Sequence, residues 1–141
     1  MKLTWDTTSM GASFPGLYER IESAARRELH RFCGEVAETA RNRCPAGSGA
    51  LRESIHSAVH TEGERLIGEI AADAPYAVYV HEGTGRYHPR GRKSRWVYPV
   101  EGEGGVRFYS TEGRRPVPFL RDAMREARRA LGRGGKDHAA D

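Results

Sequence analysis

The sequence predicts an α+β domain in which a small antiparallel sheet of about four strands packs against a long N-terminal helix and a C-terminal helix. Towards both ends of the chain, apolar residues recur at steps of three and four, which is the period of an amphipathic helix. Between these segments, short runs rich in β-branched and aromatic residues are separated by glycine-containing turns. Strands enclosed by helices in this order are typical of the α+β class.

The long N-terminal helix is expected over residues 16–43. Its apolar positions form one stripe, with Glu and Arg on the opposite face at spacings that suit ion pairs. The stripe consists of Leu17, Ile21, Ala24, Ala25, Phe32, Val36 and Ala40. The helix should stop before Pro45, because the residue preceding a proline avoids the helical region. Residues 44–49 then form a turn, and a short helical turn follows over 50–54.

A β-hairpin is expected next, with strands over 55–62 and 64–72 joined near Gly63. The second strand alternates apolar and polar residues imperfectly. A short helix should follow over 75–81, because Pro75 suits the first position of a helix.

The second half of the predicted sheet comes later in the chain. A basic, glycine-bearing loop over 86–95 leads into strands at 96–100 and 106–109, which flank a glycine-rich turn. Two prolines then precede the C-terminal helix, which is expected over 119–131.

The composition indicates one domain of modest core size. A length of 141 residues fits a single domain, and only 38% of the residues are hydrophobic while 17 are glycine. Such a domain could gain much of its order by assembling with partners. We therefore divide the chain into an extended N-terminal arm (1–15), one α+β domain (16–131) and a disordered tail (132–141).

Charge is segregated along the chain, although the net charge is only +4. Residues 53–82 hold six acidic and one basic residue, a net of −5, whereas 83–95 hold five basic and no acidic residues. Residues 114–133 hold seven basic and two acidic residues, a net of +5. Codon usage in a GC-rich genome would explain the excess of arginine equally well. Separated blocks of opposite sign can nevertheless attract copies of the same chain to one another.

The basic loop is the main candidate for a binding segment. Our first interpretation is docking on the acidic block of a neighbouring subunit. The second is contact with DNA phosphates, with Tyr87 and Trp96 available to stack on unpaired bases. The third is a solvated mobile loop without a partner. The residues concerned are Arg86, Arg90, Arg92, Lys93 and Arg95.

The sequence gives no support for a metal site or a cofactor. His56 and His60 are best placed on one strand, where they would lie about 13 Å apart at ~3.3 Å per residue, too far to share an ion. The run from Glu82 to Gly85 lacks the spacing of a phosphate-binding loop. We expect no metal, no cofactor and no catalytic residue.

Nucleophilic catalysis is equally unsupported. Ser48 lacks the surrounding pattern of a nucleophile elbow, and Cys44 has no evident histidine partner. Both cysteines should be reduced, with Cys33 in the core. No signal peptide or long apolar run is present, so we expect no membrane contact and synthesis in the cytoplasm.

Three motifs, taken together, resemble those of a known protein family. The first runs through Pro45, Gly49, Leu51, Arg52 and Ile55; the second is the run 74–85, which ends in Glu-Gly-Thr-Gly; the third is the run 111–123, which contains Pro-Phe-Leu. Their order is similar to that in the head–tail joining or tail-completion proteins of lambda-like and related siphophages. The motif residues are Pro45, Gly49, Leu51, Arg52, Tyr76, Tyr79, Glu82, Gly83, Thr84, Gly85, Pro118 and Phe119.

This resemblance implies a structural virion protein of a tailed bacteriophage or prophage, made in the bacterial host cytoplasm. It implies a homo-oligomeric ring at the neck or upper tail, in contact with other neck, head-connector or tail proteins. DNA would pass through the ring and touch it without sequence readout. Separated charge blocks suit the head-to-tail contacts from which rings close. The expected packing anchors between the helices and the sheet are Leu51, Ile55, Tyr76, Tyr79 and Phe119.

Two other classes of function remain open at this stage. A phage-encoded nucleic-acid-binding module would use loop 86–95 and bind DNA as a monomer in a salt-sensitive manner. A small nuclease or hydrolase would need a cluster of acidic or histidine side chains that the sequence does not provide. We also expect residues 83–95 and the N-terminal arm to be mobile in the free subunit and fixed on assembly.

Overall fold

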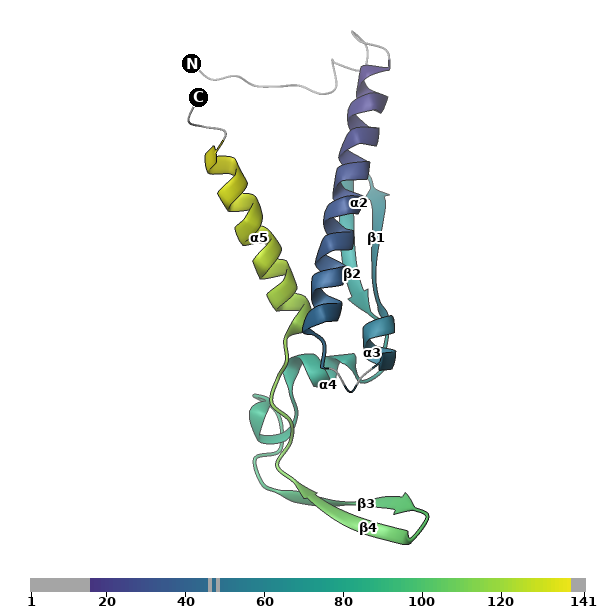
Figure 1. Ribbon diagram of the computed structural model, residues 1–141, viewed down its shortest axis with the longest axis vertical. Coiled ribbons are helices and arrows are strands. Elements are labelled where there is room, and N and C mark those ends of the chain that lie inside the picture. The colour runs from purple at the N-terminus through teal and green to yellow at the C-terminus, as the bar shows by residue number, and fades with distance from the viewer. Residues whose placement is uncertain (1–15, 46, 48, 138–141) are drawn as a thin grey trace.

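The computed structural model describes residues 16–45, 47 and 49–137, and the side chains of 16–132 within these ranges. The N-terminal arm expected over 1–15 and the last residues of the expected tail, 138–141, lie outside the described residues. The molecule is elongated, with two helices diverging from one another at one end and a β-hairpin projecting at the other (Figure 1).

Helix α2 (Leu17–Arg43) confirms the predicted long helix and ends ahead of Pro45. Its fully buried residues are Cys33, Val36, Ala37 and Ala40, all of which lie in its second half. The apolar stripe expected along the whole helix is therefore covered only in part. Ile21, for example, is 50% exposed.

A helical turn and a hairpin pack beside α2. Helix α3 (Gly49–Glu53) leads into β1 (Ile55–Glu62) and β2 (Arg65–Ala72), which pair in an antiparallel register that sets Ile55 opposite Ala72. Gly63 occupies the turn with φ 60°, as the primed turns of two-residue hairpins require. One face of this hairpin contacts α2 so closely that a Cβ at Gly68 would clash with Cys33 Sγ.

The chain then passes through α4 (Ala77–Glu82) and a 3₁₀ turn, η1 (Gly85–Tyr87), to β3 (Trp96–Gly102) and β4 (Gly105–Thr111). The single sheet of about four strands was a wrong prediction, because β1–β2 and β3–β4 form two separate two-stranded sheets. The physical reason is distance: α4 and the basic loop carry the second hairpin away from the first (Figure 1). Pro75 lies in the turn before α4 and not at its first position.

The last helix, α5 (Phe119–Asp137), begins where it was predicted but runs past residue 131. Residues 132–137 thus extend the helix beyond its predicted end, and the disordered tail stays a prediction. Once a helix is established, each further residue adds one backbone hydrogen bond, so propagation continues through glycines that would not start a helix. None of the helices within the described ranges is long and apolar enough to span a membrane.

The core lies where α2, α3, β1, α4 and the start of α5 meet. Leu51, Ile55 and Phe119 are at most 1% exposed, as predicted for packing anchors, and Cys33 is buried as expected. The prediction was wrong for Tyr76 and Tyr79, which are 39% and 60% exposed. On α4 the inward positions, three residues apart, are taken by Ala77 and Val80, so the tyrosines lie on its outer side.

Candidate assembly surface

The Glu-Gly-Thr-Gly motif forms a backbone junction with the segment that follows β4. The amide of Thr84 donates to the carbonyl oxygen of Arg114 at 2.9 Å, and the amide of Arg86 donates to that of Glu112 at 2.9 Å. In return, the amide of Arg114 donates to Thr84 Oγ1 at 2.9 Å. We call residues 83–87 with 112–115 the hairpin root, because both ends of the projecting hairpin pass through it.

Glycine is required at the root by backbone approach as well as by conformation. Gly85 has φ +60°, and a Cβ there would clash with the carbonyl oxygen of Glu112 and lie 2.7 Å from the Trp96 ring. Gly113 has φ +109°, and its Cβ would clash with the carbonyl oxygen of Thr84. The Glu-Gly-Thr-Gly motif is thus explained by close packing of two chain segments.

Glu82 fastens α4 to the start of α5. Its Oε1 atom accepts from Arg121 Nη2 at 2.8 Å and from His81 Nδ1 at 2.8 Å. His81 Nε2 faces the amide of Arg121 at 3.4 Å, and its ring lies edge-on to Phe119 at 5.5 Å. The hydrogen bond from His81, and Arg121 after it, lower the pKa of Glu82 against the opposing effect of burial. These contacts are sufficient to explain the glutamate without a ligand.

Most of the basic loop is engaged with its own chain. Glu112 pairs with Arg86 at 2.6 Å and with Arg95 at 3.5 Å, and Arg86 is the main cause of the lowered pKa of Glu112. Lys93 Nζ donates to the carbonyl oxygens of His88 at 2.7 Å and Arg86 at 3.4 Å.

The other two cations of the loop make fewer contacts. Arg90 is exposed, and Arg92 is exposed with its Nε donating to Ser94 Oγ at 3.0 Å. Arg115 lies over the Tyr87 ring at 5.5 Å, which partly occupies a face that a base would stack on. The expected ordering of 83–95 on assembly stays a prediction.

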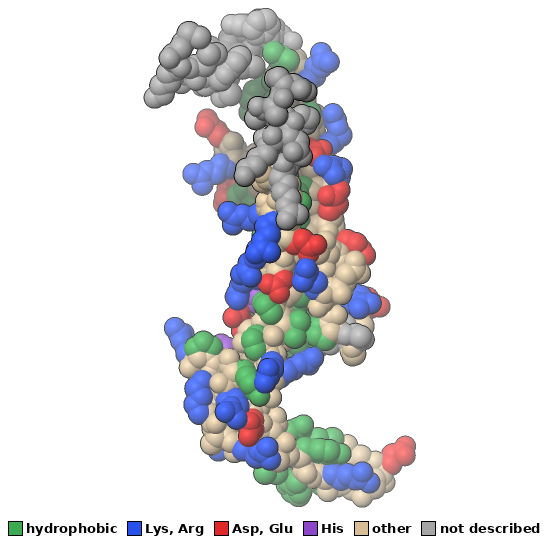
Figure 2. Space-filling view, turned by 60° about the vertical axis from the view of Figure 1, so that its left-hand side comes forward, with side chains coloured by type: hydrophobic (Ala, Val, Ile, Leu, Met, Phe, Trp, Pro, Cys, Tyr) green, Lys and Arg blue, Asp and Glu red, His purple; other side chains and the backbone are tan. Residues whose placement is uncertain are grey.

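The projecting hairpin, residues 96–111, exposes apolar side chains on both faces. The register sets Tyr98 opposite Tyr109 and Val100 opposite Arg107, and we call this side the tyrosine face. The other side, the phenylalanine face, carries Val97, Pro99, Glu101, Val106 and Phe108. Phe108 is 72% exposed and Val97 61%. Hydrophobic side chains accordingly gather along the hairpin in the space-filling view (Figure 2).

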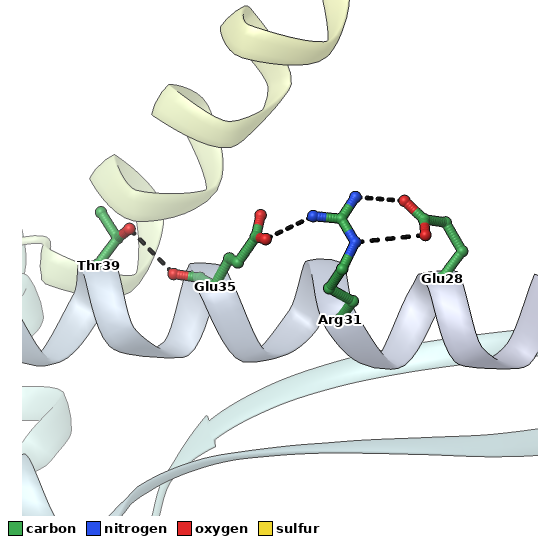
Figure 3. A network of polar contacts seen from close by, with 4 residues as sticks. All are labelled: Glu28, Arg31, Glu35 and Thr39. Carbon is green, nitrogen blue, oxygen red and sulfur yellow. Dashed lines mark hydrogen bonds and ion pairs between the residues drawn. The ribbon is translucent and has the colours of Figure 1, made fainter.

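A groove lies between α2 and α5 at the other end of the molecule. It has a volume of about 790 Å³, and its apolar walls are Phe32, Val36, Ala127, Ala130 and Leu131. On the α2 side, Arg31 joins Glu28 and Glu35 in a row that points towards α5, with Thr39 bonded to the carbonyl of Glu35 (Figure 3). Arg43 and Glu126 pair across the two helices at 2.5 Å, below the open part of the groove.

The comparison with family models supports a phage assembly role. The model described as "Bacteriophage HK97-gp10, putative tail-component" matches residues 11–83, just over half of the chain. The chain belongs to this family. No curated protein and no solved structure matches the sequence. As a member of a tail-component family, the chain is a structural protein of the phage particle and works in contact with other structural proteins.

The matched region of this HK97-gp10-like chain ends at Gly83, where the hairpin root begins. It therefore covers α2, the β1–β2 hairpin and α4, whereas the projecting hairpin and α5 lie beyond it. Family membership confirms a tail-morphogenesis protein, which is broader than the lambda-like head–tail joining proteins that the motifs resemble.

The remaining motif residues of the tail-component chain lie at helix ends or in the core. Pro45 follows α2, Gly49 begins α3, and Leu51 is fully buried while Arg52 is exposed. The carbonyl oxygen of Pro118 accepts the amide of Asp122 at 2.8 Å, in the first turn of α5. Within the described ranges, no three His, Cys, Asp or Glu side chains are placed to hold a metal ion.

The projecting hairpin was not predicted to be a binding surface. The run from Trp96 to Val100 is apolar without alternation, which is typical of a strand covered on both faces. Within the part of the chain that the structure describes, large apolar side chains on both faces stay exposed. That mismatch between a two-sided apolar pattern and an exposed position was the available indication of an assembly contact.

Proposed function

We propose that this tail-component chain is a ring-forming subunit of the phage head–tail junction or upper tail, and that its projecting hairpin joins neighbouring copies. One observation carries the proposal: the hairpin presents apolar side chains on both faces, and no described residue outside the hairpin covers them. A contiguous exposed apolar patch marks an interaction site. A two-stranded hairpin on its own is also only marginally stable in water, so it gains most from being covered.

The exposed area is sufficient for association. Six large apolar side chains of the hairpin are 42–72% exposed: Val97, Tyr98, Val100, Val106, Phe108 and Tyr109. At roughly 100 Å² each they offer on the order of 500–600 Å², most of what one partner contributes to a standard interface. Covering them is worth roughly 12 kcal/mol in gross terms, against association costs of about 4–15 kcal/mol. Repetition of the same contact around a closed ring adds further stabilising free energy to the assembly.

A structural role, and no catalytic one, also fits the polar clusters. Three glutamates have a lowered pKa: Glu82 and Glu112 hold segments of this chain together, and Glu28 pairs with Arg31 of its own helix. A DNA-binding module based on loop 86–95 is less well supported, because Arg86, Lys93 and Arg95 have partners within the chain. Arg90 and Arg92 are exposed, so they are available for non-specific contact with DNA inside a ring.

The test is the oligomeric state of the full chain with and without the hairpin. Residues 97–110 are replaced by Asn-Gly, which closes Trp96 and Thr111 with a two-residue turn. Native mass spectrometry and sedimentation velocity should show a closed oligomer for the wild type and a monomer of the shortened chain. The control variant Val78→Ser with Tyr79→Ser removes exposed apolar surface from α4 and should still assemble.

Two results would contradict the proposal. In one, the wild type stays monomeric across the concentration range. In the other, the shortened chain forms the wild-type oligomer. DNA binding is measured in parallel, and tight, salt-sensitive binding by the monomer that Arg90→Glu with Arg92→Glu abolishes would favour the nucleic-acid-binding module instead.

A further inference from the structure

We infer that the groove between α2 and α5 receives the tyrosine face of the projecting hairpin of a second copy of this chain. The inference rests on the proposed function, in which the hairpin joins subunits, and adds the surface that the hairpin binds. It also commits to one of the two faces of the hairpin.

The geometry makes this contact intermolecular. The hairpin projects from one end of the elongated molecule, beyond α4 and the hairpin root, whereas α2 and α5 open away from each other towards the opposite end (Figure 1). A hairpin cannot fold back on the groove of its own chain without undoing the root. Each copy therefore offers one hairpin and one groove at opposite ends, which is the arrangement that gives head-to-tail contacts and closed rings.

The groove has the size and lining for a few large side chains. Its volume of about 790 Å³ falls in the range that accommodates ligands of several rings. Phe32 and Ala127 line it and are only partly covered, and Leu131 is 62% exposed at its rim. On α2 the same face continues to Ile21, which is 50% exposed. The described part of the chain thus leaves these apolar positions open.

Charge selects which face of the hairpin enters. The groove is lined by three carboxylates, Glu28, Glu35 and Glu126, and one guanidinium, Arg31. Arg31 pairs with Glu28 and Glu35, and Arg43 below the groove pairs with Glu126, which leaves an excess of one negative charge. Such a rim favours a partner that donates hydrogen bonds or carries positive charge. The tyrosine face carries two phenol groups, on Tyr98 and Tyr109, and Arg107, but no carboxylate.

The alternative occupants fit less well. The phenylalanine face of the hairpin carries Glu101, which the acidic rim would repel. Nucleic acid is disfavoured for the same reason, because its phosphates would face a groove with an excess of one carboxylate over its guanidinium partners. A second copy supplies the required chemistry with one groove for every hairpin.

The experiment mixes two variants that are each defective on one side of the contact. The hairpin variant is Tyr98→Ser with Tyr109→Ser, and the groove variant is Ala130→Asp with Leu131→Asp. All four positions are exposed, so folding should be unaffected, and matching circular dichroism and melting curves check this.

Each variant alone should be monomeric, with self-association weakened at least about 30-fold. An equimolar mixture should give a one-to-one dimer and nothing larger, because only one intact hairpin faces one intact groove. Native mass spectrometry identifies this species, since each chain is 15.7 kDa and the two variants differ in mass.

Matched controls separate the two faces and the two sides of α5. Val97→Ser with Phe108→Ser, added to the groove variant, alters the phenylalanine face, and this chain should still form the dimer with the hairpin variant, which supplies the intact groove. Arg128→Asp adds an acidic residue to α5 outside the groove and should leave assembly unchanged.

The outcomes distinguish this inference from the proposed function. If the groove variant assembles like the wild type while the hairpin variant does not, the hairpin joins subunits at another surface and the inference is wrong. A mixture that stays monomeric overturns it as well. A photo-crosslinker at position 98 should label peptides 28–39 or 126–131 of the second copy, and labelling of a different protein or of another surface would also refute it. If the wild type never assembles, the proposed function fails first.

Discussion

Replacement of Gly85 by alanine is the sharpest test of how the hairpin is held. Gly85 has φ +60°, and a Cβ there would clash with the carbonyl oxygen of Glu112 and lie 2.8 Å from the Cα of Gly113. Because the obstacles are backbone atoms, rotation of a side chain cannot relieve the clash. The two segments of the root must move apart.

The cost can be worked out from two contributions. A left-handed conformation costs a residue with a Cβ roughly 1–2 kcal/mol. Separating the segments also breaks the bonds from the amides of Thr84 and Arg86, each worth about 1 kcal/mol. The total is roughly 3–4 kcal/mol, a large part of the ~5–15 kcal/mol that stabilises a typical domain.

The loss should be local, because the root lies outside the buried core. Hydrogen exchange at the amides of Thr84, Arg86 and Arg114 should accelerate in Gly85→Ala, while amides in the second half of α2 keep their protection. Gly104→Ala is the matched control: Gly104 has no positive φ, and its Cβ would meet only the Arg107 guanidinium at 3.8 Å. If these three amides were equally protected from hydrogen exchange in the two variants, the clash at Gly85 would not hold the root as described.

Three further predictions concern stability. Phe119→Ala, at a position 1% exposed, should lower the free energy of unfolding by about 3–5 kcal/mol in urea titrations, and a loss below ~1 kcal/mol would mean that α5 is not anchored there. Gly34→Ala should raise it by about 0.5–1 kcal/mol, because Gly34 lies inside α2 with open space around it; a decrease would show an unseen contact. The pKa of Glu112 is lowered below 4.5, chiefly by Arg86, so its stabilising effect is complete above pH 4.5 and is lost as pH falls through the lowered value. Between pH 7 and pH 3 the wild type should therefore lose more stability than Glu112→Gln, and parallel curves would contradict this.

Local elements were predictable because their periodicities are local. The stripe of α2, the turn glycine of β1–β2 and the proline-bounded start of α5 each follow from neighbours in sequence. Whether the two hairpins pair in one sheet was not predictable from the sequence, because it depends on the direction in which the hairpin root directs the second hairpin. Nothing between Glu82 and Trp96 indicates locally that the second hairpin turns away from the first.

Tyr76, which precedes α4, and Tyr79 within it show a second limit. Large apolar residues were expected to face inwards, but the short helix is oriented by Ala77 and Val80 instead. The amide of Val117 donates to the carbonyl oxygen of Val80 at 2.9 Å, so α4 must lie close to the segment that enters α5. A small residue permits that approach and a tyrosine does not, which a rule based on hydrophobicity alone misses.

The charge blocks of the sequence have a different meaning in three dimensions. Glu112 lies outside the acidic block, yet it pairs with Arg86 and Arg95 of the basic block. Glu82, from the acidic block, pairs with Arg121 of the second basic block in the same chain. Much of the charge that seemed available for neighbours is thus used within the subunit. What remains unmatched is apolar: two faces of a hairpin and the open end of a groove. Salt screens exposed charges but does not weaken apolar burial, so assembly through this contact should persist at ionic strengths that would dissolve a purely electrostatic one.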